Sequence, residues 1–149
     1  MKSVREIMTK DVATVSTNDN IYEAAKKMHD LNVGFIPIVD DEQHLMGAVT
    51  DRDLVLRGYA NKKSGSAPIT EVMSDELNSV SPETSLQEAS QIMADKQIRR
   101  LPVVENGKLV GIVSLGDLSQ DEASDHAAGV ALGEISERKG DRLNQERPM

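Results

Sequence analysis

Two pairs of side chains in this sequence place a carboxylate three residues after a hydroxyl, first as Thr50 and Asp53 and again as Ser114 and Asp117. In a capping box, the hydroxyl accepts a hydrogen bond from an amide at the start of a helix, and the carboxylate accepts one in return. In a ligand site, the helix start attracts phosphate, the hydroxyl adds a donor, and the carboxylate accepts both hydroxyls of a ribose. The two interpretations are compatible, and the spacing alone favours the capping box.

Positive charge that could hold a phosphate occurs at one of two related places. Arg99-Arg100 comes just before Pro102, whereas the related stretch before Pro37 reads Gly34-Phe35. Adjacent arginines are most often solvated surface residues, but a position beside a helix start strengthens the case for a ligand role. Both prolines are predicted on edge strands, because proline has no amide hydrogen to donate to a ladder. A groove along such an edge would expose backbone groups to a ligand.

These residues occupy related positions because the chain contains one supersecondary unit twice. Residues 4–40 match a later stretch at an offset of 73 − 8 = 65, and after a one-residue deletion the match continues at 117 − 53 = 64. The matching pairs include Met8/Met73, Val15/Val80, Ala24/Ala89, Met28/Met93, Pro37/Pro102, Gly47/Gly111 and Asp53/Asp117. Each copy is too short to bury a core alone, so the two should pack on each other and leave related clefts.

The apolar spacing within each copy predicts the same order of elements. A short strand at 12–15, with its counterpart at 77–80, precedes a helix whose apolar face repeats from Ile21 to Leu31. The helix starts carry candidate capping boxes, Asn20 with Glu23 and Ser85 with Glu88.

Two buried strands then form a hairpin in each copy. In the first copy they are predicted at 35–39 and 45–50, and in the second copy the turn contains Asn106-Gly107, a strong hairpin signal. A short helix follows at 51–57. Because the long connection returns the first strand beside the hairpin, we predict an α/β (α+β) fold of two strand-helix-strand-strand-helix repeats, packed with pseudo-two-fold symmetry.

The repeats set the expected domain organisation. We predict repeat 1 at 1–60, a linker at 61–68, repeat 2 at 69–120, and a C-terminal helix with a flexible tail at 121–149. The linker is rich in Lys, Ser and Gly and ends in a proline. A weak apolar stripe predicts the C-terminal helix, at Ala128, Ala131, Leu132 and Ile135.

Composition excludes several classes of function. Cysteine is absent, which rules out disulfides, thiolate metal sites and cysteine nucleophiles. A net charge of −8 and a pI near 4.9 argue against nucleic-acid binding, which needs a basic face. No apolar run approaches the roughly 20 residues of a membrane span, and none follows the N-terminus as in a signal peptide. We expect a cytoplasmic protein.

Catalytic chemistry finds little support in the sequence. Asp51-Arg52-Asp53 resembles a two-acid metal motif, but the second copy offers Leu115-Gly116-Asp117 instead, and residues 40–42 read as a solvated turn. His29, His44 and His126 lack the spacing of metal ligands, and the sequence has neither a Walker loop nor a dinucleotide fingerprint. We therefore expect neither an enzyme nor a metal site.

The order of motifs in both copies resembles paired cystathionine-β-synthase (CBS) domains, the Bateman module, of the stand-alone bacterial type. The resemblance covers roughly residues 1–120 and rests on Val/Ile-Met near the start, Ala-x-x-x-Met in the helix, Pro-Val/Ile-Val, and Gly-x-Val-Thr/Ser-x-x-Asp. It implies a regulatory module that binds adenosine-containing ligands in two clefts between the half-domains and forms a homodimer shaped like a flat disc.

Carried onto this sequence, the resemblance implies that Thr50 and Asp53 hold phosphate and ribose in one cleft, and Ser114 and Asp117 in the other. Arg99-Arg100 would reach the phosphates in the Asp53 cleft, which leaves the Asp117 cleft with adenosine bound weakly, a different ligand or none. The adenine pockets would be lined by Val12, Thr14, Ile36, Pro37, Leu77, Ser79, Leu101 and Pro102.

The resemblance also implies the ligand and the partners. AMP, ADP or ATP is the expected ligand, with S-adenosylmethionine, NAD or a cyclic dinucleotide as alternatives, and no resident cofactor is expected. The module would act in trans on a regulated protein. The alternative is a ligand-free scaffold that engages another protein through its dimer surface or its C-terminal helix.

Overall fold

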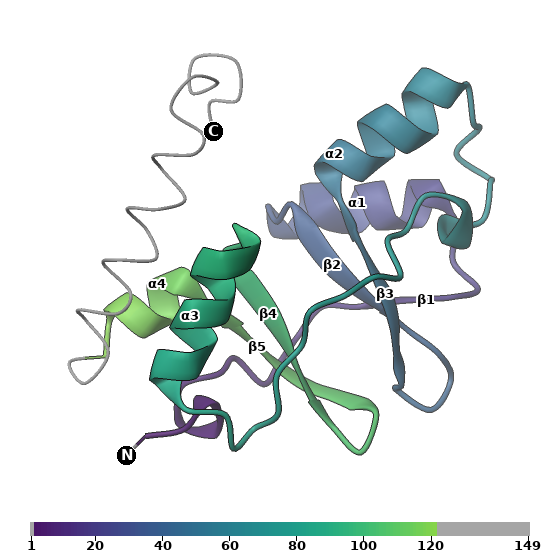
Figure 1. Ribbon diagram of the computed structural model, residues 1–149. Coiled ribbons are helices and arrows are strands. Elements are labelled where there is room, and N and C mark those ends of the chain that lie inside the picture. Colours follow the sequence, from purple (N-terminus) through teal and green to yellow (C-terminus); the bar gives the residue numbers. More distant parts are fainter. Residues whose placement is uncertain (1, 122–149) are drawn as a thin grey trace, which may run out of the picture. The chain divides into compact units, whose positions relative to one another are not determined.

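The structure is a computed structural model that describes residues 2–121 of the 149 (Figure 1). Its described residues form two compact units, one of residues 11–78 with 104–110, and one of residues 2–10, 79–103 and 111–121. We call these the 11–78 unit and the 79–121 unit, and describe each by itself. The compact units do not coincide with the sequence repeats, because each unit includes chain from both.

A three-stranded sheet forms the centre of the 11–78 unit. Strands β2 (Phe35–Val39) and β3 (Leu45–Thr50) pair antiparallel from Phe35↔Thr50 to Val39↔Leu45, which confirms the predicted hairpin. Strand β1 (Val15–Ser16) lies parallel to β2, with Val15 opposite Ile38. The strand order is therefore β1-β2-β3, and the first strand returns beside the hairpin as the sequence predicts.

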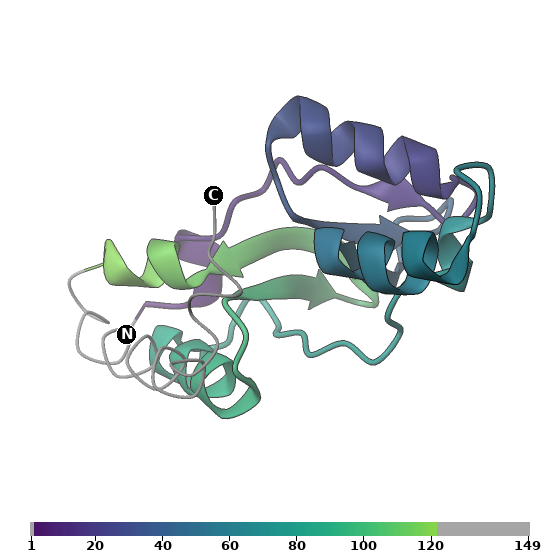
Figure 2. The same cartoon turned by 90° about the horizontal axis from the view of Figure 1, so that it is seen from above.

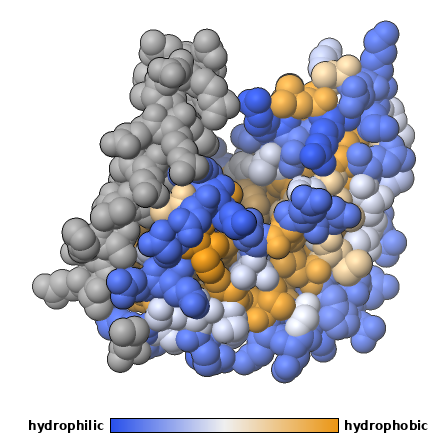
Figure 3. Space-filling model, viewed as in Figure 1, coloured by the Kyte–Doolittle hydropathy of each residue, from blue (hydrophilic) through white to orange (hydrophobic). Residues whose placement is uncertain are grey.

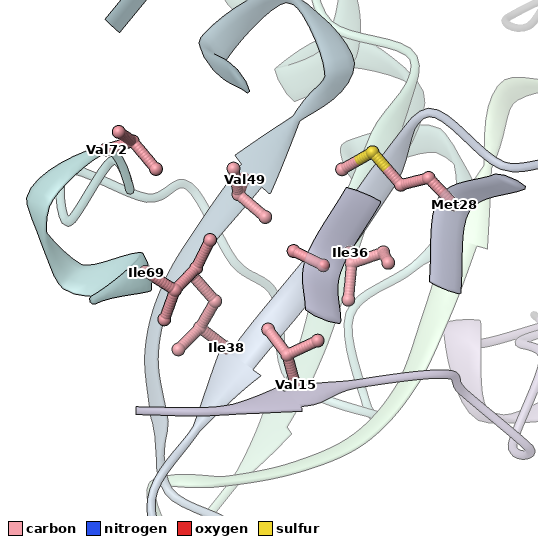
Figure 4. Close-up of a cluster of buried hydrophobic side chains, with 8 residues drawn as sticks. Val15, Met28, Ile36, Ile38, Val49, Ile69 and Val72 are labelled. Carbon is pink, nitrogen blue, oxygen red and sulfur yellow. The ribbon is translucent and has the colours of Figure 1, made fainter. Parts of the chain in front are cut away.

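Helix α1 (Ile21–Leu31) covers one face of this sheet, as the two views in Figures 1 and 2 show. Its predicted capping box is confirmed, since Asn20 Oδ1 accepts from the Glu23 amide at 2.8 Å and Glu23 Oε1 accepts from the Asn20 amide at 3.1 Å. Its apolar stripe buries Ala24 and Met28. Figure 4 shows the resulting core, a cluster of Val15, Ala24, Met28, Ile36, Ile38, Val49, Ile69 and Val72.

The first strand of each copy is shorter than predicted. Of the strand predicted at 12–15, only Val15 pairs with β2, and the strand continues to Ser16. The counterpart at 77–80 is reduced to one parallel bridge from Val80 to Val103. The prolines explain this. Val80 N–H donates to the Pro102 carbonyl at 3.0 Å, but the next rung towards the N-terminus would need an amide hydrogen that proline lacks.

The same geometry corrects the prediction that the prolines lie on edge strands. Pro37 lies opposite Ala48 in β2, which is the central strand of its sheet. Pro102 has β5 on one side of its strand and the Val80 bridge on the other. A central position is tolerated because the parallel neighbour pairs with the proline carbonyl, and the ladder ends before the rung that would need the missing amide hydrogen.

The helix after β3 is longer and less regular than the predicted 51–57. It begins as α2 (Asp51–Asp53), widens to a π-helical stretch η2 (Leu54–Gly58), and ends as a 3₁₀ turn η3 (Tyr59–Asn61). It packs against α1, since a Cβ added to buried Gly58 would lie 3.7 Å from Ile21 Cδ1.

The 79–121 unit repeats this plan. Helix α3 (Leu86–Lys96) begins where Ser85 Oγ accepts from the Glu88 amide at 3.1 Å. Strands β4 (Arg100–Glu105) and β5 (Lys108–Ser114) form the second hairpin, of which residues 104–110 belong to the 11–78 unit. Asn106 and Gly107 adopt the positive φ angles of 56° and 80° that its tight turn needs. Helix α4 (Leu115–Ser119) follows β5.

The leading segment of each repeat pairs with a strand of the other repeat. Ser74 and Ala48 exchange amide-carbonyl hydrogen bonds at 2.9 and 3.0 Å within the 11–78 unit. Thr9 and Ile112 do the same at 2.8 and 2.9 Å within the 79–121 unit. Two 3₁₀ turns precede these bridges, η1 (Val4–Glu6) and η4 (Ile69–Glu71). This exchange explains why compact units and sequence repeats differ.

The predicted C-terminal helix lies outside the described residues. Within residues 2–121, every helix is too short or too polar to cross a membrane.

Candidate functional site

Both hydroxyl-carboxylate pairs form capping boxes. The Asp53 amide donates to Thr50 Oγ1 at 3.0 Å and the Thr50 amide donates to Asp53 Oδ2 at 2.9 Å. In the other unit the Asp117 amide donates to Ser114 Oγ at 3.1 Å and the Ser114 amide donates to Asp117 Oδ2 at 2.9 Å. The capping interpretation is therefore confirmed at both helix starts, with nearly identical geometry.

Each closed box leaves groups that a ligand could use. The cap occupies Oδ2 of each aspartate, so Oδ1 keeps its acceptor capacity, and the hydroxyl that accepts from an amide still has a proton to donate. The Asp53 side chain is 21% exposed, and its Oδ1 lies 4.0 Å from Arg57 Nε. Capping and ribose binding can therefore coexist on one carboxylate.

The amides at the helix starts are less available to an anion than the sequence implies. In the first copy the Asp51 amide donates to the Gly34 carbonyl at 3.0 Å, and the Arg52 amide donates to Asp51 Oδ1 at 2.8 Å. With the Asp53 amide held by Thr50, the first three amides of this helix all have acceptors. A phosphate there would have to be bound by side chains.

The residue before each hairpin is held to the helix that follows the hairpin. Arg99 accepts a hydrogen bond at its carbonyl from the Leu115 amide at 2.9 Å, just as Gly34 does from Asp51. A Cβ on Gly34 would lie only 2.9 Å from Asp51 Oδ2, so glycine makes room for this carboxylate. The two copies thus differ at two positions that contact each other. The first copy has Gly34 and Asp51, and the second copy has Arg99 and Leu115 at the same places.

The second copy carries two positively charged residues before its hairpin, where the first copy carries none. Arg99 and Arg100 are exposed, and within residues 2–121 their guanidinium groups make no hydrogen bond or ion pair with a neighbouring side chain. The structure places the Arg99 backbone next to the start of α4, in the same unit as Ser114 and Asp117. The predicted partnership of these arginines with Asp53 joins residues of different units and stays a prediction.

The residues expected around adenine also divide between the units. In the 11–78 unit, Ile36 and Pro37 are buried in β2, and Thr14 stands just before β1, with its carbonyl accepting from Lys27 Nζ at 2.6 Å. Val12 and Leu77 are half-buried in the same unit, outside the strands. In the 79–121 unit, Leu101 and Pro102 are buried in β4, beside Val80 and its exposed neighbour Ser79.

One cavity of about 200 Å³ adjoins a predicted site residue. Ile7, Asp117, Gln120 and Asp121 line it. Asp121 is buried and forms an ion pair with Lys2, whose Nζ lies 2.8 Å from its Oδ2. Sequence reasoning did not single out Asp121, which lies just beyond the end of α4.

The described residues offer no metal centre. No group of three or more His, Asp or Glu side chains lies close enough to hold an ion in the part of the chain from 2 to 121. His29 contacts only Asp30, at 3.1 Å, and His44 contacts only Asp40, at 3.0 Å, among the ion pairs there.

Comparison with known proteins shows the family. The CBS domain model matches residues 4–58 and again residues 69–121. CBS domain-containing protein YhcV of Bacillus subtilis (strain 168) is 52% identical over 136 residues, which make up 91% of this chain and 96% of that protein.

Three solved structures share the fold. Hypoxic Response Protein I with two coordinated zinc ions matches with a TM-score of 0.75 at 34% identity, covering 80% of this chain and 98% of that one. The CBS domain pair of MJ0100 in complex with 5′-methylthioadenosine and S-adenosyl-L-methionine matches with a TM-score of 0.71 at 30% identity, covering 80% and 94%. CBSX2 in complex with AMP matches with a TM-score of 0.71 at 27% identity, covering 80% and 95%.

Proposed function

This chain belongs to the CBS domain family, with two CBS domains in tandem, and on that premise we propose that it is a non-catalytic regulatory module for adenine nucleotides. The observation that carries the proposal is the duplicated capping box. In each copy it fixes one carboxylate through Oδ2 and leaves Oδ1 and a hydroxyl proton available beside a buried, proline-containing strand. The adenosine group shared by the ligands of MJ0100 and CBSX2 supports an adenosine ligand here.

Each part of such a ligand has a candidate partner. Asp53 and Asp117 would accept the ribose hydroxyls at Oδ1, while Thr50 and Ser114 would donate to phosphate. The amides at the first helix start already have acceptors, so a phosphate would need positively charged side chains. Arg99-Arg100 would supply that charge. Adenine would contact backbone and side-chain groups at Val12, Thr14, Ile36, Pro37, Leu77, Ser79, Leu101 and Pro102.

The two sites are proposed to differ in ligand. A site that includes Arg99-Arg100 favours AMP, ADP or ATP, whereas a site without them favours a ligand with little phosphate charge, such as S-adenosylmethionine or its fragments. NAD and cyclic dinucleotides remain alternatives with the same adenosine group. Binding would shift the module between states that a protein partner in trans distinguishes, by no more than the difference in ligand affinity between those states. The homodimer and the cytoplasmic location expected from the sequence stay predictions.

A thermal-shift panel with AMP, ADP, ATP and S-adenosylmethionine tests the proposal, with calorimetry on the best ligand. Ligand at 100 times its dissociation constant should add about 2.7 kcal/mol to the free energy of unfolding, which is several degrees in Tm. Asp53→Ala and Asp117→Ala should each remove the shift from one site. Asn20→Ala is the matched control, because it opens the capping box of α1 at a similar loss of about 1 kcal/mol but should keep the ligand shift.

Two results would count against this assignment. If none of the four ligands raises Tm while the variants fold normally, the scaffold function becomes the better account. If a ligand binds equally to the wild type, Asp53→Ala and Asp117→Ala, binding occurs but the capping-box carboxylates do not hold the ribose.

A further inference from the structure

Helix α3 is buried on a face that stays exposed on the matching helix α1. At the offset of 90 − 25 = 65 that aligns the repeats, the matched pairs are Ala25 and Ser90, His29 and Ala94, and Asn32 and Gln97. Ser90 is 1% exposed and Ala94 is 2% exposed. In the first copy Ala25 is exposed, and the side chain of His29 is 87% exposed. Gln97 is half-buried where Asn32 is exposed.

This face is separate from the core side of α3 and from its solvent side. Ala89 and Met93 form the core side, since both are buried as their counterparts in α1 are. Gln91 donates to Asp95 Oδ1 at 2.9 Å on the solvent side, and Figure 3 shows mainly hydrophilic surface where α3 lies in Figure 1. Residues 90, 94 and 97 are spaced by four and three positions, which places them together on a further face. We call Ser90, Ala94 and Gln97 the α3 side face.

Two polar atoms on the α3 side face lack a hydrogen-bond partner. Among the described residues, the buried side-chain atoms without a partner are Ser90 Oγ and Gln97 Oε1. The other end of the Gln97 side chain is satisfied, because Nε2 donates to the Ala94 carbonyl at 2.8 Å. Buried polar groups in proteins are nearly always hydrogen-bonded. The two atoms therefore indicate a covering segment that supplies their partners.

The described neighbours of α3 do not explain why it is more buried than α1. Helix α4 packs against α3 as the η2 stretch packs against α1. Ser3 bridges Ser85 just before α3, and Pro68 bridges Asn20 just before α1 in the same way. The helix after β3 is longer than α4, so α1 has more described chain beside it than α3 has. The extra burial of α3 needs a segment that the first copy does not have.

We propose that residues 122–149 of the same chain cover the α3 side face, through the apolar stripe of Ala128, Ala131, Leu132 and Ile135. The segment begins directly after α4, where Leu118 is fully buried although its counterpart Leu54 is only half-buried. Residues 122–127 can span at most about 20 Å, and packed helices lie about 8–10 Å apart, so the stripe reaches α3. The corresponding stretch of the first copy leads into the second repeat instead.

The stripe and the α3 side face fit each other in size and in hydrogen bonding. Ser90 and Ala94 are small, and the stripe contains two alanines, so two helices can approach closely there. The leucine and isoleucine of the stripe add the apolar area that the α3 side face lacks. His126 and Arg138, on either side of the stripe, carry side-chain donors of the kind that Gln97 Oε1 requires.

Thiol reactivity tests the proposal, because the natural chain has no cysteine. In the full chain, Ala94→Cys should react with a maleimide about tenfold more slowly than His29→Cys, the matched position of the first copy. Each rate is compared with that of the same variant in denaturant. Adding Leu132→Asp with Ile135→Asp should remove the protection of the Ala94→Cys thiol. Circular dichroism and thermal unfolding check that each variant folds.

A control and a crosslink identify the covering segment. Asn144→Asp with Gln145→Glu adds the same charge to the segment outside the stripe and should leave the Ala94→Cys thiol protected. Under mild oxidation, Ala94→Cys with Ala131→Cys should form a disulfide within one chain. His29→Cys with Ala131→Cys should not form one.

Three results would overturn the proposal. Equal reaction rates of Ala94→Cys and His29→Cys would show that the α3 side face is open in solution. Protection that survives Leu132→Asp with Ile135→Asp would assign the cover to another part of the molecule. Protection that disappears on dilution, with a disulfide between chains, would assign it to a second copy. The inference goes beyond the proposed function, and failure of the nucleotide panel would leave its outcome unchanged.

Discussion

The sulfur of Met73 lies where a side chain at position 47 would begin. A Cβ added to Gly47 would be 2.8 Å from Met73 Sδ and 2.7 Å from the Ser74 carbonyl oxygen. The same relationship recurs between Met8 and Gly111, at 2.7 Å. Each glycine therefore lets the leading segment of the other repeat come close enough to pair with its strand.

Gly47→Ala should destabilise the protein by about 1–3 kcal/mol, because the added methyl group meets a backbone carbonyl that cannot move without breaking the bridge at Ser74. Chemical denaturation measures the loss. Gly116→Ala is the control, since a Cβ there would lie 3.6 Å from its nearest neighbour and alanine favours a helix by up to about 1 kcal/mol. Equal stability of Gly47→Ala and the wild type would contradict the close packing.

Ile69→Ala should lower the free energy of unfolding by about 2–5 kcal/mol, because Ile69 is fully buried in the core of the 11–78 unit although it begins the second repeat. Leu31→Ala, at a side chain that is 51% exposed, should cause a much smaller loss. Denaturant midpoints compare the two. A small effect of Ile69→Ala would show that the leading segment contributes little to this core.

Arg99→Gln combined with Arg100→Gln should weaken binding of ATP more than binding of adenosine, because the guanidinium groups are proposed to meet phosphates. Stability should change by less than about 0.5 kcal/mol, since both side chains are exposed. Calorimetry with adenosine, AMP and ATP gives the series of affinities. Arg52→Gln, at an exposed arginine of the first copy, is the control. A uniform loss for all three ligands would place the arginines away from the phosphates.

The turn at Asp40 should give the stability a measurable acid dependence. The hydrogen bond from the His44 amide holds the pKa of Asp40 below its ordinary 3.8, and desolvation opposes it only in part. Because the folded pKa is the lower one, the stabilisation is present above pH 3.8 and is lost as the pH falls through the folded value.

Asp40→Asn should therefore flatten the decline in denaturant midpoint on acidification below about pH 4. Asp41→Asn removes a charge from the neighbouring exposed position and should leave that decline as in the wild type. If the Asp40→Asn and wild-type curves ran parallel down to pH 2, the shifted pKa would be refuted.

Periodicity and turn chemistry were sufficient to predict most of the elements. The strands at 35–39 and 45–50, the helix from Ile21 and the Asn106-Gly107 turn are confirmed, because local preferences and the fold agree there. The first strand of each copy was predicted too long, because proline in the neighbouring strand has no amide hydrogen for the next ladder hydrogen bond. The partner of each leading segment is a non-local choice that no local pattern encodes.

The candidate site was also predictable only in part. The capping boxes follow from a three-residue spacing and are confirmed. The occupied amides at the first helix start depend on the Gly34 carbonyl and the Asp51 carboxylate, which come together only after folding. The cavity beside Asp117 is lined by Ile7, which is distant in sequence, as well as by the neighbouring Asp121. Residue spacing alone could therefore not predict the cavity.

The exchange of leading segments has a consequence for how the chain is made. Residues 2–10 are synthesised before the strand with which they pair, because Ile112 follows Thr9 by more than a hundred residues. The first hairpin likewise pairs with Ser74, which is synthesised after it. We therefore expect each repeat to complete its fold only after the other has been synthesised, and we expect halves separated at the linker to lose these pairings and with them part of their stability.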